Sequence, residues 1–238
     1  MCGRFALLTH AEALIERFRV DEVIKRPEPR YNIAPTQNVT VVVQRETRQL
    51  TEMRWGLIPF WAKDVSIGNR MINARSETVT EKPSFRTAFK KRRCLILADG
   101  FYEWQKAGKI KVPMHIRLKS REPFAFAGLY EYWETKSGRL LESCTIITTK
   151  PNELMNPIHQ RMPVILHPED ESTWLNPENQ NVAELLSMLK PYTSNPMEAF
   201  AVSKFVNSPS NQGPLCVKPV DVPLIGISGE LNTSSGSA

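Results

Sequence analysis

Short apolar runs rich in β-branched and aromatic residues recur along most of this chain, which is typical of β-strands. They predict strands at Val39–Val43, Leu50–Trp55, Cys94–Ala98, Phe101–Gln105, Val112–Leu118, Phe124–Tyr130 and Cys144–Thr149. The segment Lys106–Lys109, which contains Gly108, predicts a hairpin turn between two of these strands.

Helical patterns are fewer and shorter. The spacing Thr9-x-x-Glu12 resembles a capping box, which predicts a helix that begins at Thr9 and carries Leu14, Ile15 and Phe18 on one side. Further short helices are predicted at Ser84–Arg93, Asp170–Leu175 and Val182–Leu189. Because strands follow one another without a regular alternation of strand and helix, the pattern predicts an α+β fold around antiparallel sheet.

Length and composition fit one globular domain. A chain of 238 residues lies within the range of a single core, and its 18 prolines form no linker-like cluster. We predict one domain at residues 1–225 and a disordered polar tail at 226–238. No apolar run approaches the roughly 20 residues of a membrane span, and the N-terminus lacks the features of a signal peptide. The four cysteines are far apart, without a zinc-type or disulfide-type spacing, so we expect free thiols and a cytoplasmic protein.

Positive charge is concentrated in one segment. The chain carries a net charge of +6, but residues 86–121 hold eleven basic and two acidic residues, a net +9, so the remainder sums to −3. Such a segment suits a polyanion because phosphate contacts release counterions, but a solvated lysine-rich face would give the same pattern.

Cys2 is the residue with the most specific chemistry. It is small enough for an aminopeptidase to remove Met1, which would leave Cys2 as the first residue. Its α-amine, with a pKa of about 8, would be partly neutral near pH 7 and able to attack an aldehyde. The neighbouring thiol would then close the imine into a five-membered thiazolidine ring, an intramolecular step with a high effective concentration. Without further signals, Cys2 would be an incidental second residue.

Several motifs accompany Cys2 in a fixed order. They are MCGRF at the start, RYNIAPTQ (30–37), RWGLIPFWAK (54–63), MINARSET (71–78), ADGFYEW (98–104) and IHQRMPVIL (158–166), with VSKFVNSP closing the series at Pro209. Together they resemble the SOS-response-associated peptidase (SRAP) family of abasic-site processing proteins. The resemblance covers nearly the whole predicted domain.

The resemblance implies a fold, an activity and a set of site residues. The fold would be a barrel-like antiparallel sheet with short peripheral helices. The activity would be covalent capture of abasic sites in single-stranded DNA as a thiazolidine, without metal or organic cofactor, by a monomer with no obligate protein partner, nucleoid-associated when bound to DNA. Cys2 would be the nucleophile, with Asn73, Glu103 and His159 completing the catalytic site. The residues expected to contact DNA are Arg4, Asn32, Trp61, Arg75 and Arg161.

The residue types agree with these roles. Glu103 lies in an apolar strand, where burial raises a carboxyl pKa and leaves a proton available to expel water as an imine forms. His159 lies in a polar loop and can move protons around the sugar during ring opening or reversal. The family often has aspartate after this histidine, whereas Gln160 follows it here, which leaves the pKa of His159 open. Asn73 can hold the Cys2 amine and a sugar or phosphate oxygen.

The arginines and tryptophans have ordinary alternatives. Arg4, Arg75 and Arg161 can grip phosphates in a bidentate manner, but single arginines often form surface ion pairs. Trp61 is the better candidate for stacking on a base, because Trp55 ends a strand and is expected in the core.

Two other functions use some of the same residues. An N-terminal-nucleophile hydrolase or cysteine peptidase would use Cys2 and His159, and autocatalytic removal of Met1 would fit that activity. A non-catalytic single-strand binder would use the basic segment and the tryptophans but would leave Cys2 and Glu103 unexplained.

Overall fold

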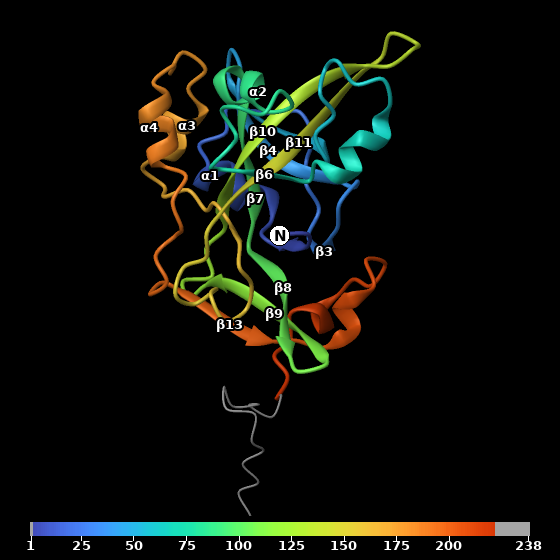
Figure 1. Ribbon diagram of the computed structural model, residues 1–238, viewed down its shortest axis with the longest axis vertical. Helices are drawn as coiled ribbons and strands as arrows, with labels where there is room; N and C mark the ends of the chain where they lie inside the picture. Colours follow the sequence, from blue (N-terminus) through green and yellow to red (C-terminus); the bar gives the residue numbers. More distant parts are fainter. Residues whose placement is uncertain (1, 222–238) are drawn as a thin grey trace, which may run out of the picture.

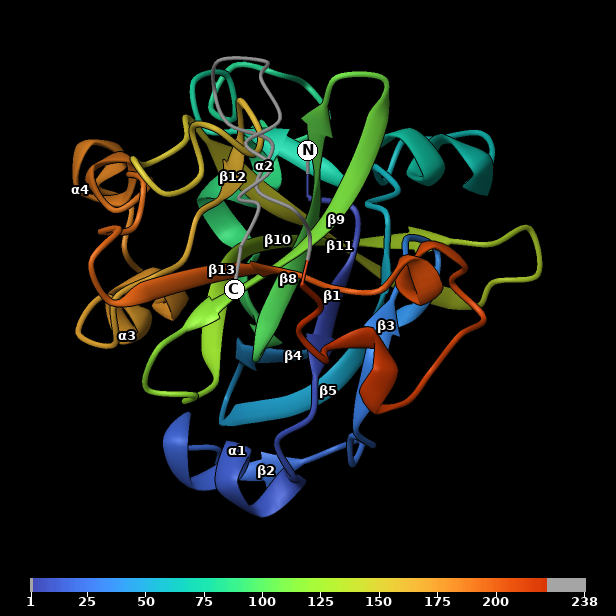
Figure 2. The same ribbon diagram turned by 90° about the horizontal axis from the view of Figure 1, so that it is seen from below.

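The strands form two sheets that share one core. The structure is a computed structural model and describes residues 2–221 of the chain. One sheet has the strand order β13-β9-β8-β1-β3, with bounds Met197–Ala201, Ile110–Leu118, Gly100–Ala107, Phe5–Leu7 and Arg30–Ile33. Figure 1 shows β8 continuing from β7 (Arg93–Ala98) and carrying the chain from one sheet to the other, and Figure 2 shows β8 beside β9 and β1. The sheet order therefore pairs the N-terminal strand β1 with β8, whose residues lie near the middle of the sequence.

The second sheet closes on itself. Its path is β12-β11-β10-β7-β4-β5-β2, with bounds Met162–Pro163, Leu140–Thr149, Phe124–Glu134, Arg93–Ala98, Asn38–Gln44, Arg48–Trp55 and Glu22–Val23. A parallel pairing of Cys144 in β11 with Trp55 in β5 closes the strands β11, β10, β7, β4 and β5 into a five-stranded barrel, with β12 and β2 outside the closed ring. The short strand β6 (Asn73–Arg75) also pairs with β11. The predicted α+β class and its barrel-like sheet are confirmed.

Aromatic side chains fill the space between the sheets. Phe5 of β1 packs against Trp55 at 5.2 Å and Phe126 at 5.7 Å between ring centroids, and Phe101 of β8 packs against Phe126 at 6.0 Å. All four rings are completely buried. Trp55 is thus a core residue, as predicted, and this packing fixes β1 and β8 against the barrel.

The seven predicted strands and the four predicted helices are present. The first helix is α1 (Ala11–Arg17), and the others are α2 (Arg86–Lys91), α3 (Glu171–Leu175) and α4 (Val182–Ser187), each slightly shorter than predicted. The hairpin turn lies at Gly108, whose φ is +61°. Three 3-10 segments, at Val65–Arg70, Lys204–Asn207 and Pro214–Cys216, were not predicted. The predicted boundary at residue 225 and the tail lie outside the described residues. No helix among residues 2–221 has the length and apolarity to span a membrane.

The prediction of a capping box at Thr9 is wrong. Helix α1 (Ala11–Arg17) has His10 as its N-cap, and no side chain caps it. The Thr9 hydroxyl instead donates to Asp99 Oδ1 at 2.7 Å, and the Thr9 N–H donates to Asp99 Oδ2 at 2.8 Å. The Thr9 hydroxyl thus binds a partner 90 residues away and does not cap the helix. A local sequence pattern does not reveal such a distant partner.

The basic segment does not form one surface. Helix α2 and the β8–β9 hairpin, which carry most of its charges, lie at opposite ends of the molecule in Figure 1. Arg93 is buried, and Arg92 and Arg117 form ion pairs with Glu131 and Glu198. The sequence cluster is therefore not by itself a binding face for a polyanion.

Replacing Arg93 with methionine should destabilise the fold by about 3–5 kcal/mol, because hydrogen bonds to charged groups contribute about 1.5–3 kcal/mol each and are not additive. All five N–H groups of this guanidinium donate to backbone carbonyls, those of Phe89, Lys90, Trp174, Asn176 and Asn179. Urea unfolding measures the loss, with the exposed Lys91→Met as the matched control. Equal stability of the two variants would contradict this role of Arg93.

Candidate active site

Cys2 lies just before β1 at the edge of the shared core. Its side chain is completely buried, and its backbone carbonyl accepts a hydrogen bond from Asn73 Nδ2 at 2.8 Å. In the antiparallel pairing of β1 with β8, Phe5 lies opposite Phe101, and the Tyr102 N–H donates to the Arg4 carbonyl at 2.9 Å. Continuing this register places Glu103 beside the residues that precede Arg4.

Glu103 faces the inner side of its sheet. Side chains alternate along a strand, and Phe101 lies in the main core whereas Tyr102 lies in a separate cluster on the outer side. Glu103, which is 4% exposed, therefore points to the same side as Phe101. Burial raises the pKa of Glu103 to about 7, against the opposing effect of the positive N-terminal amine. A carboxyl group in this state holds a proton near neutral pH.

Asn73 contacts Cys2 from the other sheet, and His159 lies in a connection between two strands of that sheet. Asn73 begins β6, which β11 holds in parallel register through the pair Asn73 and Ile146. The Asn73 Oδ1 atom is buried and accepts no hydrogen bond from the described residues. His159 lies in the connection between β11 and β12, which Gln105 of β8 anchors by donating to the Pro157 carbonyl at 3.2 Å.

The imidazole of His159 is half-buried and oriented by the backbone. The Arg161 N–H donates to His159 Nδ1 at 3.0 Å. Burial lowers the pKa of His159, and the N-terminal amine adds to this effect, while the hydrogen bond to the Arg161 backbone opposes it. The positive charge at the terminus of the unprocessed chain lowers the pKa of Cys2, Glu103 and His159 alike.

The Cys2 thiol is not set up as a resting thiolate. Burial raises its pKa, and the negative charge of Glu103 raises it further. A cysteine peptidase needs the opposite shift, produced by a nearby imidazolium. The four cysteines are all free and buried. Among residues 2–221, no three His, Cys, Asp or Glu side chains lie together as metal ligands would.

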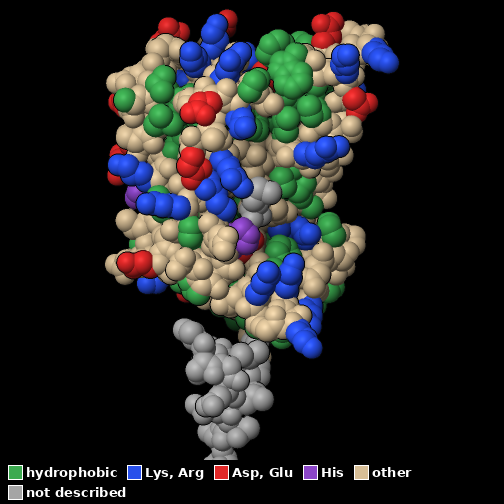
Figure 3. Space-filling model, viewed as in Figure 1, with side chains coloured by type: hydrophobic (Ala, Val, Ile, Leu, Met, Phe, Trp, Pro, Cys, Tyr) green, Lys and Arg blue, Asp and Glu red, His purple; other side chains and the backbone are tan. Residues whose placement is uncertain are grey.

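The five residues expected to contact DNA have different surroundings. Arg75 is exposed and projects from the same side of β6 as Asn73, because Ala74 between them points into the core. Trp61 is 48% exposed next to Phe60, at 60%. Arg161 is largely buried and forms a bidentate ion pair with Glu77. Figure 3 shows basic side chains scattered over this face and interspersed with acidic ones, not gathered in a single patch.

Arg4 and Asn32 serve the fold in this structure. Asn32 is completely buried, and its Nδ2 atom lies within hydrogen-bond distance of the carbonyls of Val206, Ser208 and Asn211. The Arg4 guanidinium, in a residue 9% exposed, donates to Asn32 Oδ1 and the Val206 carbonyl, both at 2.7 Å. Both side chains thus tie the C-terminal segment to β1, and their contact with DNA stays a prediction.

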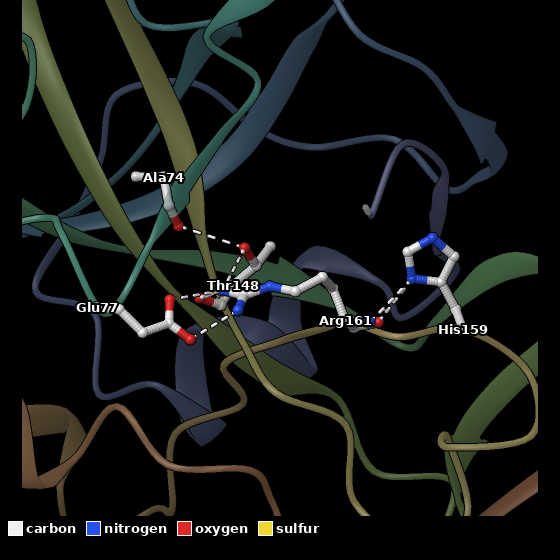
Figure 4. A network of polar contacts seen from close by, with 5 residues as sticks. All are labelled: Ala74, Glu77, Thr148, His159 and Arg161. Carbon is white, nitrogen blue, oxygen red and sulfur yellow. Dashed lines mark hydrogen bonds and ion pairs between the residues drawn. The ribbon is translucent and has the colours of Figure 1, made fainter.

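Two neighbours of the site were not predicted. Glu77 and Thr148 both contact the Arg161 side chain, as Figure 4 shows. Glu77 lies within the MINARSET segment, so its position was visible in the sequence, but its partner is 84 residues away. Thr148 ends an apolar run and carried no signal of its own.

Comparison with known proteins agrees with this architecture. The family model described as SOS response associated peptidase (SRAP) matches residues 1–209. The abasic site processing protein YoqW of Bacillus subtilis (strain 168) is 54% identical over 218 residues, which cover 90% of this chain and 97% of the relative. The abasic site processing protein HMCES of Gallus gallus is 31% identical over 245 residues, which cover 89% and 71%. A crystal structure of a Bacteroides thetaiotaomicron protein has a TM-score of 0.83 at 30% identity and covers 92% of this chain and 100% of that one.

Proposed function

Because this chain belongs to the SOS response associated peptidase (SRAP) family, whose matched relatives are named abasic site processing proteins, we propose that it processes abasic sites in DNA. In single-stranded DNA it forms a covalent crosslink through Cys2 once Met1 has been removed. The observation that carries this proposal is the gathering of Cys2, Asn73, Glu103 and His159 from four separate segments around the start of the chain.

The reaction has two bond-forming steps. The neutral α-amine of Cys2 adds to the aldehyde carbon of the ring-opened sugar, and the carbinolamine then loses its hydroxyl as water to give an imine. The thiol sulfur adds to the imine carbon, and its proton passes to the nitrogen, closing the thiazolidine ring. The product contains the protein and the abasic strand less one water.

Each nearby residue has a task in this sequence. Glu103, which holds a proton near neutral pH, protonates the departing hydroxyl. Asn73 fixes the Cys2 backbone through its amide N–H and offers to the amine its Oδ1 atom, which accepts no hydrogen bond from residues 2–221. His159 exchanges protons with the sugar oxygens during ring opening and during reversal of the crosslink. The raised pKa of the Cys2 thiol supports this order of events over a peptidase mechanism, because the amine and not a thiolate attacks first.

A direct experiment is intact mass spectrometry of the purified protein, alone and after incubation with single-stranded DNA that contains one abasic site. We expect a chain that starts at Cys2 and an adduct of both masses less one water. The same strand with its aldehyde reduced to an alcohol is the control and should give no adduct. Adduct formation with the reduced strand, or none with the abasic strand, would overturn the proposal, and cleavage of a fluorogenic peptide panel would point to the hydrolase.

Non-covalent DNA binding should depend on charges near the site more than on charges at the hairpin. Reversal of Arg75, on the exposed side of β6 next to Asn73, should weaken binding more than reversal of Lys109 or Lys111 at the β8–β9 turn. Arg161→Glu should also weaken binding more than the hairpin variants do, although it breaks the ion pair with Glu77 as well. Fluorescence anisotropy at several salt concentrations measures the effect, which should shrink as salt rises. Equal losses for all four variants would mean that the DNA path lies elsewhere.

A further inference from the structure

A bidentate ion pair holds the Arg161 side chain beside the candidate active site. Its two terminal nitrogens donate to the Glu77 carboxylate at 2.6 and 3.0 Å, and Nη2 also donates to the Thr148 carbonyl at 2.6 Å. Figure 4 shows the guanidinium between Glu77 and the end of β11. The geometry is the planar fork that arginine forms with carboxylates.

The backbone of Arg161 in turn holds the imidazole of His159. The N–H of Arg161 lies 3.0 Å from His159 Nδ1, and the carbonyl of Arg161 lies 3.1 Å from the same atom. A backbone N–H can only donate, so the neutral ring accepts this bond at Nδ1 and carries its proton on Nε2. When Nδ1 is protonated, it can donate to the carbonyl instead. Figure 4 shows Nε2 on the side of the ring that faces away from Arg161.

The segment from His159 to Arg161 lies outside helix and sheet, since regular structure resumes only at Met162 in β12. The His159 N–H donates to the Met155 carbonyl at 2.8 Å, which holds the backbone, whereas the imidazole is held by Arg161. A partly exposed ion pair adds little to global stability, since the Glu77 side chain is 50% exposed. Its effect is therefore local: it fixes the residue whose backbone orients the histidine.

We propose that Glu77 is a positioning residue, which acts through Arg161 to hold His159 with Nδ1 on the backbone and Nε2 turned toward the substrate. This inference rests on the proposed function, in which His159 serves ring opening and reversal of the crosslink. The positive charge of Arg161 lowers the pKa of His159. The negative charge of Glu77 offsets part of that positive charge. Glu77 itself need not touch the DNA.

The test is Glu77→Gln, with Glu81→Gln as the matched control, because Glu81 is an exposed acidic residue only four positions away. In DNA-free protein labelled with ¹⁵N, the hydrogen bond between the Arg161 N–H and His159 Nδ1 gives a coupling between the two nitrogens. We expect this coupling in the wild type and in Glu81→Gln, and its loss or marked reduction in Glu77→Gln. A coupling that survives in Glu77→Gln would overturn the inference, whether or not the protein crosslinks DNA.

A kinetic arm shows whether the effect passes through His159. Glu77→Gln should slow release of DNA from a preformed adduct about threefold to thirtyfold, a fraction of what a positioned acid–base group contributes. In a His159→Ala background the same substitution should change the rate no further, because the group that it positions is absent. Glu77→Asp should restore part of the rate. Additive losses would overturn the inference, whereas absence of any wild-type adduct would overturn the proposed function and leave the coupling measurement to decide the role of Glu77.

Discussion

Cys2→Ala should form no covalent adduct with abasic single-stranded DNA, whereas its non-covalent affinity should stay within about twofold of wild type, since phosphate contacts supply most of the affinity. The variant keeps an α-amine but has no thiol to close the ring, so any imine hydrolyses on denaturation. Denaturing gels measure the adduct, and anisotropy measures the affinity.

Two further variants sharpen this experiment. Cys2→Ser should give only a labile imine that survives when reduced, because a hydroxyl closes the ring less well than a thiol. Cys216→Ala removes a buried thiol on the outer side of the sheet that contains β1 and β8, and this variant should crosslink like the wild type. A heat-stable adduct in Cys2→Ala would rule out the thiazolidine mechanism.

Glu103→Gln should slow crosslinking by one to two orders of magnitude or more, within the range of a positioned general acid. Glutamine keeps the shape of the side chain but has no acidic proton, so folding and DNA binding should survive. Single-turnover rates of adduct formation measure the loss. A wild-type rate in this variant, together with an inactive His159→Ala, would mean that the two residues exchange roles.

The pH profile offers a second measurement of Glu103. With a pKa of about 7, its carboxyl group loses the proton as pH rises through neutrality, so the wild-type rate should fall above that pH. The neutral fraction of an α-amine rises up to a pKa of about 8, which gives the opposite limb. We expect a bell-shaped profile in the wild type and only the rising limb in Glu103→Gln.

The pH dependence of the free energy of unfolding should reveal the Glu103 carboxyl group in the absence of DNA. A carboxyl pKa raised from 4.5 to about 7 means that the folded state binds the proton more tightly than the unfolded state. The contribution is present below pH 4.5 and is lost as pH rises through 7, so the fold should weaken across that window. Glu103→Gln should remove this part of the pH dependence in urea unfolding.

The sequence predicted the long strands well because each carries enough apolar residues to mark its own burial. The short strands β1, β3 and β6 were missed, since three or four residues give no period and their pairing depends on distant partners. Of these, β1 follows Cys2 directly and β6 begins with Asn73. Local patterns therefore revealed β8, the strand that carries Glu103, but not the two short strands that bring Cys2 and Asn73 together.

The motifs marked the site residues but not their directions. Asn73 and Asn32 both lie in short motif segments, yet one contacts Cys2 and the other ties together a distant loop. Side-chain direction depends on which face of a strand is buried, and this is decided by the assembly of the two sheets. For the same reason the sequence did not distinguish exposed Arg75 from Arg161, whose side chain is held in an ion pair with Glu77.

The burial of Cys2 also sets an order of events during synthesis. Arg4 is fastened to the Val206 carbonyl, 202 residues further along, and Cys2 to Asn73, 71 residues away. The first strand therefore stays unlocked until nearly the whole domain has left the ribosome. The long-range contacts that enclose the Cys2 thiol can therefore form only late in synthesis, and until then the thiol of the nascent chain is exposed to solvent.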